Sequence, residues 1–200
     1  ICSQPVDDPV RARIATIERI EKLGAEVLYV NANVADISAM RGDSEQAQQR
    51  FGTRHGVIHG AGIVGDDAYR EIKDSDHDNC DGHFQAKAHG LLVLEQVLDG
   101  RTLDLCLLLS SLTSVLGGIG QAAYASSNIY MDSFARRHNR TSPVPWLSVN
   151  WDVWRLHDHA TNDSGLGITL KELGMSAEEA MEMMETALAV TTSSQLVVST

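Results

Sequence analysis

Cysteine, proline and aromatic residues are scarce in this chain of 200 residues, which holds 3 cysteines, 4 prolines and 5% aromatic residues. Cys2, Cys80 and Cys106 are far apart, and no Cys-x-x-Cys pair occurs. The sequence therefore supports neither a disulfide framework nor a zinc knuckle. We expect a reducing, cytoplasmic setting.

Basic residues are also fewer than acidic ones: the chain has 16 Lys and Arg and 27 Asp and Glu, which gives a net charge of −11. Nucleic acids and anionic membranes bind basic surfaces, so neither is an expected partner. The most apolar stretch, residues 103–120, contains Asp104 and several serines and falls short of the roughly 20 apolar residues of a membrane span. The N-terminus lacks the basic start and apolar run of a signal peptide.

Helix-type and strand-type patterns alternate along the chain. Apolar residues at helical spacing predict a helix over Pro9–Leu23. Further helices are predicted over Ile37–Phe51, which is polar, Asp78–Leu98, Gln121–His138 and Ser176–Leu188, which begins with a capping box. Short apolar or β-branched runs predict strands over Glu26–Asn31, Gly56–His59, Leu103–Leu109, Val144–Val149 and Gln195–Ser199. Strands separated by long helices imply a parallel sheet covered on both faces, so the fold class is a doubly wound α/β domain.

Chemistry in such a sheet is expected beyond the carboxyl ends of the strands. Residues 60–62 (Gly-Ala-Gly) follow one strand, and Ser110 and Ser111 follow another. A glycine-rich loop at 117–120 then leads into a helix that carries Tyr124 and Asn128. Taken singly, these features are explained by a tight turn, a cap and a half-buried tyrosine.

The spacing of the set is more specific than its parts. Lys87 precedes Tyr124 by 37 residues, Ser111 precedes it by 13, and Asn128 follows it by 4. This pattern resembles the ketoreductase domain of modular polyketide synthases, a branch of the short-chain dehydrogenase/reductase superfamily. Most of that superfamily carries Tyr-x-x-x-Lys, and Asn128 is similar to the branch in which Lys and Asn have exchanged places.

Five stretches carry the resemblance over nearly the whole chain: residues 23–36 (LGAEVLYVNANVAD), 57–62 (VIHGAG), 107–128 (LLLSSLTSVLGGIGQAAYASSN), 147–154 (LSVNWDVW) and 195–200 (QLVVST). The resemblance implies a Rossmann-like sheet and one ketoreductase domain over residues 1–200. It also implies that residues 155–175 form the substrate lid.

The resemblance implies an oxidoreductase and assigns four catalytic residues. Hydride transfer to a ketone builds negative charge on the carbonyl oxygen, which needs a hydrogen-bond donor and a proton source. Ser111 would be the donor and Tyr124 the proton source. The Lys87 ammonium would stabilise the tyrosinate and hold a ribose hydroxyl, while Asn128 would position Lys87 or a proton-relaying water.

The resemblance further implies NADPH as the cofactor and a β-ketoacyl thioester, tethered by phosphopantetheine to an acyl carrier protein, as the substrate. Neighbouring domains of a multidomain synthase are the other expected partners. The cofactor-binding residues would be Asn33, Val34, Gly60, Ala61, Gly62, Lys87 and Tyr124. The substrate-binding residues would be Asp66, Leu116 and Gln121.

Two positions bear on the configuration of the product. The family's R-hydroxyl type has a Leu-Asp-Asp motif after its His-Ala-Ala-Gly strand; Asp66 matches the second Asp, but Gly65 replaces the first. The S-hydroxyl type has a Trp where this chain has Leu116. These residues favour the R-hydroxyl product, although a solvated turn would also explain Asp66.

One segment of the superfamily has no counterpart here: the first strand with its Gly-x-Gly-x-x-Gly phosphate loop. Gln4 and Asn33 also stand where the family often has Arg and Asp. We expect the domain to be N-terminally incomplete as given, and to show weak or no NADPH turnover alone. The chain could be a fragment, a polypeptide that lost its upstream part, or a degenerate relative.

Other functional classes remain as alternatives. A non-catalytic scaffold within a synthase and a free-standing short-chain dehydrogenase both fit the pattern. A metal site is not expected, because His157-Asp158-His159 and the scattered histidines lack helical ligand spacing. A serine hydrolase is disfavoured, since the Gly-x-Ser-x-Gly elbow is missing.

Overall fold

The computed structural model describes residues 9–63, 70–155, 174–190 and 192–199, and it divides the chain into two units, residues 1–32 and 33–200. Helix α1 (Pro9–Lys22) belongs to the first unit. This helix confirms the prediction from the sequence. It ends before Gly24, whose φ of +92° lies in a region that favours glycine.

The predicted strand over Glu26–Asn31 is wrong, because these residues form no β-ladder. The β-branched composition of this segment suits a strand, but a strand exists only through hydrogen bonds to a neighbour. Among the described residues, every strand belongs to a single sheet, and that sheet includes no residue of the first unit. Residues 26–31 therefore have the composition of a strand but pair with no other strand in the described part of the chain.

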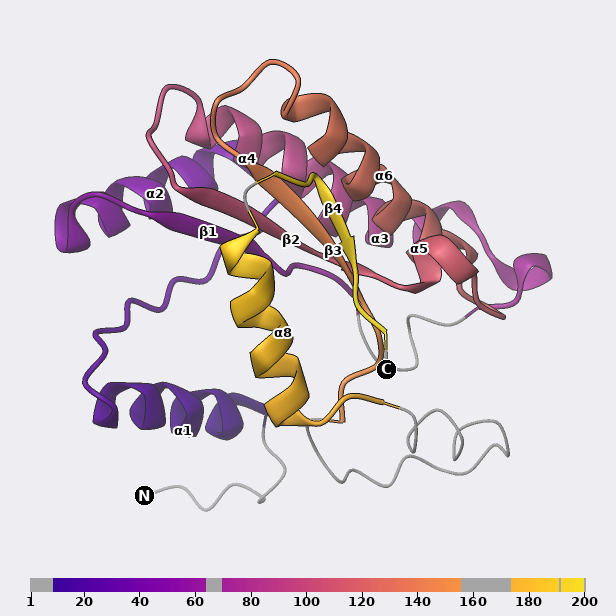
Figure 1. Cartoon of the computed structure of the whole chain (residues 1–200), viewed down its shortest axis with the longest axis horizontal. Helices are drawn as coiled ribbons and strands as arrows, with labels where there is room; N and C mark the ends of the chain where they lie inside the picture. Colours follow the sequence, from indigo (N-terminus) through magenta and orange to yellow (C-terminus); the bar gives the residue numbers. More distant parts are fainter. Residues whose placement is uncertain (1–8, 64–69, 156–173, 191, 200) are drawn as a thin grey trace. The chain divides into compact units, whose positions relative to one another are not determined.

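The second unit is built on a four-stranded parallel sheet in the order β1-β2-β3-β4. Its strands are β1 (Gly56–His59), β2 (Leu105–Ser111), β3 (Trp146–Trp151) and β4 (Gln195–Val197) (Figure 1). Both β2 and β3 begin and end two residues later than the sequence pattern predicts. Ser110 and Ser111 are polar, yet they pair with Asn150 and Trp151 and so extend the ladder.

One helix precedes β1, and the other helical segments of the second unit lie between the strands. They are α2 (Ile37–Phe51), the short 3₁₀ helix η2 (Ile72–Asp74), α3 (His77–Phe84), the π-helical turn η3 (Gln85–His89), α4 (Gly90–Leu98), α5 (Thr113–Leu116), α6 (Ala122–His138) and α8 (Ala177–Ala189). The predicted helix over 78–98 is thus three consecutive segments with a π-turn in the middle. The capping box predicted at the start of the last helix is present, with Ser176 as its N-cap.

Alternate residues of β2 pack on opposite faces of the sheet. Cys106 and Leu108 join a core with Leu91 and Leu94 of α4 and with Met131 and Phe134 of α6. Leu107 joins a second core that includes Ala187 of α8. The sheet is therefore covered on both faces, with α4 and α6 over one face and α8 over the other (Figure 1), as the doubly wound prediction requires.

The position of α8 reverses the hand of one connection. Consecutive strands are neighbours throughout the sheet, so a crossover on the opposite face has the opposite hand to those through α4 and α6. Opposite-handed crossovers are rare in parallel sheets. This one contains residues 155–175, the predicted lid, of which 156–173 lie outside the described residues. The two ends of that segment are joined, since the Arg155 N–H donates to the Met175 carbonyl oxygen at 2.8 Å.

Candidate active site

Tyr124 lies in the first turn of α6, at the carboxyl end of the sheet, and its side chain is half-buried. Nζ of Lys87 lies 5.5 Å from the centroid of its ring. The ring of His83 from α3 makes an edge-on contact at 5.9 Å between centroids. The Tyr124 ring is thus close to both a cation and a buried imidazole.

Lys87 lies in the π-turn η3 and is 4% exposed. Its Nζ donates a hydrogen bond to the Leu109 carbonyl oxygen of β2 at 3.1 Å. Burial lowers the pKa of Lys87 to about 8, and the charge of Asp132 partly offsets this effect. The side chain therefore keeps its ammonium below about pH 8 and has lost much of it at pH 9. A π-turn in this position is typical of functional sites in helices.

Asn128 is fully buried one turn after Tyr124. Its Nδ2 donates to the Tyr124 carbonyl oxygen at 2.8 Å. Its Oδ1 is buried and has no hydrogen-bond partner among the described residues. A buried carbonyl oxygen without a partner is costly, so this atom is available to a water or another donor in the site.

Ser111 ends β2 and is 9% exposed. Its Oγ accepts hydrogen bonds from the Thr113 backbone N–H at 3.2 Å and from Thr113 Oγ1 at 3.0 Å. The Ser111 hydroxyl proton remains available for an outside acceptor. No contact between described residues joins Ser111 directly to Tyr124, and the two are linked through β2, whose Leu109 carbonyl binds Lys87.

The turn after β1 passes directly against the lysine. A Cβ at Gly62 would lie 3.2 Å from Cε and 3.6 Å from Nζ of Lys87, and a Cβ at Gly60 would lie 3.1 Å from Cδ1 of Leu109. Gly60 and Gly62 are exposed, and Ala61 between them is half-buried. This backbone can approach a ligand more closely than any turn with side chains could.

Asn33 and Val34 begin the second unit. Asn33 Oδ1 accepts from the Ala35 N–H at 3.0 Å, which shapes a turn before α2. Val34 packs so closely on Gly90 that a Cβ there would lie 2.8 Å from Val34 Cγ2 and 3.4 Å from Cε1 of His59. Val34 therefore lies next to the carboxyl end of β1.

The predicted substrate residues are only partly described. Leu116, the last residue of α5, is 76% exposed. Gln121 occupies the N-cap position of α6 without making a side-chain cap. Asp66 lies outside the described residues. Val115 of α5 and Ile119 of the following turn are also 54% and 90% exposed, and sequence reasoning did not single them out. Their apolar character beside a glycine-rich loop was the available signal.

Two buried histidines next to Lys87 were also missed as members of the site. His59 ends β1 and His83 lies in α3, and each has a buried ring nitrogen without a partner among the described residues. Burial and the nearby Lys87 lower the pKa of His59 to about 4 and also lower that of His83. Both rings are neutral at pH 7, which leaves the positive charge of Lys87 alone among them.

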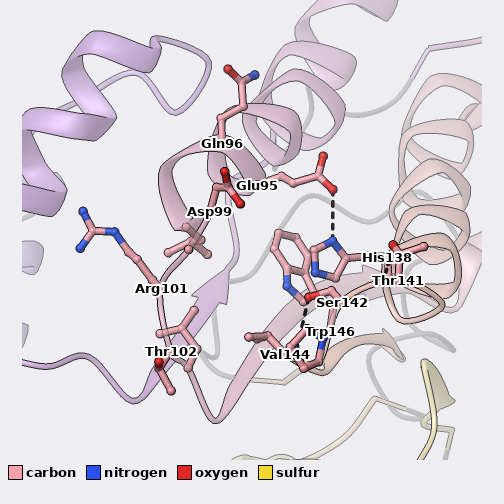
Figure 2. A pocket seen from close by; sticks show the side chains of 14 residues that line it. Glu95, Gln96, Asp99, Arg101, Thr102, His138, Thr141, Ser142, Val144 and Trp146 are labelled. Carbon is pink, nitrogen blue, oxygen red and sulfur yellow. Dashed lines mark hydrogen bonds and ion pairs between the residues drawn. The ribbon is translucent and has the colours of Figure 1, made fainter.

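A cavity of about 650 Å³ lies away from these residues, at the amino ends of β2 and β3. Figure 2 shows its side chains, among them Glu95, whose carboxylate accepts from Nδ1 of His138 at 3.1 Å, and Trp146. Ligands of parallel sheets bind at the other end of the strands. The candidate active site is therefore the group around Lys87 and Tyr124, and this cavity is separate from it.

Comparison with known proteins decides the family. The KR domain family matches residues 3–156 of this chain. The chain belongs to that family. It is 32% identical over 190 residues to the polyketide synthase PksM of Bacillus subtilis, a match that covers 91% of this chain and 4% of the synthase. It is also 33% identical over 154 residues to a 6-methylsalicylic acid synthase of Arthrobotrys oligospora, covering 74% of this chain and 8% of that protein.

Solved structures agree with this assignment. A ketoreductase domain from the bacillaene assembly line has a TM-score of 0.80 and 28% identity, over 98% of this chain and 48% of that one. The chain is thus a polyketide synthase ketoreductase domain of the short-chain dehydrogenase/reductase superfamily, with its Rossmann-like fold, and it spans a small fraction of the synthases it matches. None of the helices that the structure describes is long and apolar enough to cross a membrane.

Proposed function

We propose that this KR domain reduces a β-ketoacyl thioester, held on an acyl carrier protein by phosphopantetheine, to the β-hydroxyacyl thioester with NADPH. The observation that carries the proposal is the pairing of Lys87 with Tyr124, in which a buried ammonium lies 5.5 Å from the centroid of the tyrosine ring. Membership of the KR family supports ketone reduction and a nicotinamide cofactor.

The described residues fit such a cofactor. The side-chain-free turn at Gly60 and Gly62 leaves room for a ligand beside Lys87. Asn33, Val34 and Ala61 would complete the binding surface, and Lys87 and Tyr124 would face the reacting end. When bound, the reduced nicotinamide supplies the hydride.

The chain's own residues then handle the substrate oxygen. As the carbonyl carbon receives the hydride, its oxygen gains negative charge, and Ser111 stabilises that charge by donating its hydroxyl proton in a hydrogen bond. Tyr124 transfers its phenolic proton to the same oxygen, so the ketone becomes an alcohol and the tyrosine a tyrosinate.

Lys87 and Asn128 restore the tyrosine. The ammonium of Lys87 stabilises the tyrosinate electrostatically. The free Oδ1 of Asn128 can hold a water through which solvent returns a proton to Tyr124. Each of the four residues therefore has a distinct role: Ser111 stabilises the oxygen, Tyr124 donates the proton, Lys87 stabilises the tyrosinate and Asn128 holds the water that reprotonates it.

An exposed apolar surface on α5 and the turn after it supports an acyl substrate. Val115, Leu116 and Ile119 present unpaired apolar surface just beyond Ser111. Gln121, at the start of α6, adds a polar side chain at the same edge. We assign the R-hydroxyl product on Asp66 and on Leu116, which stands where the S-hydroxyl type has Trp.

The proposal is tested on the domain in its natural polypeptide, by following NADPH absorbance with a short β-ketoacyl thioester and resolving the product on a chiral column. Turnover with R-hydroxyl product and a preference for NADPH over NADH supports it. Turnover of small alcohols without thioester preference indicates a free-standing dehydrogenase activity. Cofactor binding without turnover of any ketone indicates a scaffold.

A further inference from the structure

Asp132 is a buried carboxylate that the reaction as described above does not use. It lies in α6, four residues after Asn128 and eight after Tyr124, and is 2% exposed. Residues at this spacing share one face of a helix, so Tyr124, Asn128 and Asp132 form a single row. The row leads from the half-buried tyrosine into the interior of the domain.

The Asp132 carboxylate accepts hydrogen bonds from four side chains. Oδ1 accepts from Ser148 Oγ of β3 at 2.6 Å. Oδ2 accepts from Ser114 Oγ of α5 at 2.8 Å, Asn150 Nδ2 of β3 at 2.8 Å and Gln195 Nε2 of β4 at 3.3 Å. All these groups are available as donors, which is the environment of an ionised carboxylate.

The same network reaches the catalytic serine. Asn150 Nδ2 lies 2.9 Å from Ser110 Oγ, 2.7 Å from Ser114 Oγ and 3.3 Å from the Ser111 carbonyl oxygen. An amide nitrogen has two protons, so these contacts and the one to Asp132 are shared. Together with the Ser114 bond, they tie the end of β2 and the start of α5 to α6, on either side of Ser111.

Asp132 also acts on the charge of Lys87. The titratable groups around this lysine are His59 of β1, His83 of α3, and Tyr124 and Asp132 of α6. Both histidines are kept neutral at pH 7 by burial and by the lysine. Among these groups in the described part of the chain, Asp132 supplies the negative charge that opposes the desolvation of the ammonium.

We propose that Asp132 is a positioning residue of the reductase, which fixes the Ser111 turn through its hydrogen bonds and serves as the buried counter-charge of Lys87. The inference rests on the proposed function and extends it to a residue that contacts none of the reacting atoms. Its two effects are separable, because hydrogen bonds set the geometry of Ser111 and charge sets the protonation of Lys87.

The test replaces Asp132 in the natural polypeptide by Asn, which keeps the shape, and by Ser, which leaves room for a water. Both variants are expected to lower kcat at pH 7 about tenfold, since a small displacement of Ser111 suffices for that loss. In the profile of kcat against pH, the alkaline limb is expected to shift to lower pH by about half to one unit, because Lys87 loses its counter-charge. The Lys87 side-chain NMR titration, recorded without substrate, should move equally.

Two matched variants separate charge from packing. Ser148→Ala removes the 2.6 Å bond to Oδ1 but leaves the carboxylate, so the alkaline limb should stay in place. Adding Ser114→Asp to Asp132→Ser returns a carboxylate within reach of the same donors and should move the limb back toward its original pH.

The outcomes distinguish this inference from the proposed function. If the unmodified domain reduces substrate but the limb and the Lys87 titration are unmoved in both Asp132 variants, the counter-charge inference is wrong. If both variants fail to fold, Asp132 is a requirement of the fold and the inference is also wrong. If the unmodified domain shows no turnover, the proposed function fails, and the NMR titration still decides whether Asp132 acts on Lys87.

Discussion

Lys87 and Tyr124 come from different helical segments, yet Nζ of the lysine lies 5.5 Å from the centroid of the tyrosine ring. The π-turn η3 directs Lys87 inward, and its hydrogen bond to the Leu109 carbonyl anchors it to β2. The ammonium of Lys87 is buried and is desolvated at a cost to stability. Natural proteins accept such a cost at functional sites, which agrees with the proposed role of the Lys87 charge.

Replacing Lys87 by Met should abolish activity and stabilise the fold at pH 7 by about 2 kcal/mol, because the desolvated charge disappears. The lowered pKa of Lys87 also determines how the stability of the unmodified protein changes with pH. The pKa of Lys87 is about 8 in the folded protein, below its usual 10.5, so the unfolded chain binds more protons between these values. Stability of the unmodified protein should rise from pH 8 to 10.5, and the Met variant should lack that rise in urea unfolding curves.

His59 should make the fold acid-sensitive. Its pKa is lowered from 6.5 to about 4, so between these pH values His59 is protonated in the unfolded chain and neutral in the folded protein. Stability should fall as the pH decreases from 6.5 toward 4, by about 3 kcal/mol in total. His59→Asn should flatten this dependence, whereas the same change at His77, whose side chain is 90% exposed, should not. If both variants lose stability equally at low pH, the acid sensitivity does not come from His59.

Gly62→Ala should weaken cofactor binding. The added Cβ would lie 3.2 Å from Lys87 Cε, so the lysine or the turn must shift in the place where the cofactor is expected. We expect an increase of about tenfold in the Kd for NADPH, measured by the change in its fluorescence. Gly56→Ala, at the start of β1, is the control, since its Cβ would meet only Leu105 O at an ordinary 3.7 Å. Similar affinities for the two variants would place the cofactor elsewhere.

Cys106 should be inert in the folded protein. It is the second residue of β2 and is 0% exposed, and burial raises the pKa of its thiol to about 12. Alkylation by iodoacetamide at pH 8 should reach Cys80, which is half-buried, and should modify Cys106 only as fast as the domain unfolds. Peptide mass spectrometry over a time course measures both rates, and comparable rates would contradict the packing of β2.

Much of this fold could be predicted from the sequence, because alternating helical and strand periodicity is a local property. The segment 26–31 shows where local reasoning fails: its β-branched residues suit a strand, but pairing depends on a neighbour that periodicity cannot reveal. The two-residue offset of β2 has a similar cause. Its last residues are serines, which only the ladder to Asn150 and Trp151 identifies as strand.

The sequence predicted the residues of the candidate site from their types and spacings. It could not predict the groups that hold them in place. Lys87, Tyr124 and Asn128 are in fact brought together, as a resemblance to a family motif allows one to expect. The π-turn around Lys87 depends on packing against β2, and the inward direction of Asp132 depends on β3 and β4. Neither has a signature in the sequence, since a single aspartate in a helix is usually exposed.

The most direct test of the account is the reaction of Tyr124→Phe in the natural polypeptide, with NADPH binding measured on the same sample. Phe keeps the ring beside Lys87 and removes the hydroxyl that carries the transferable proton. The account predicts that the variant still binds NADPH, with at most a modest rise in Kd, and that kcat for a β-ketoacyl thioester falls about a thousandfold. A variant that binds NADPH and reduces the thioester at nearly the original rate would show that Tyr124 is not the acid and that the reacting site lies elsewhere.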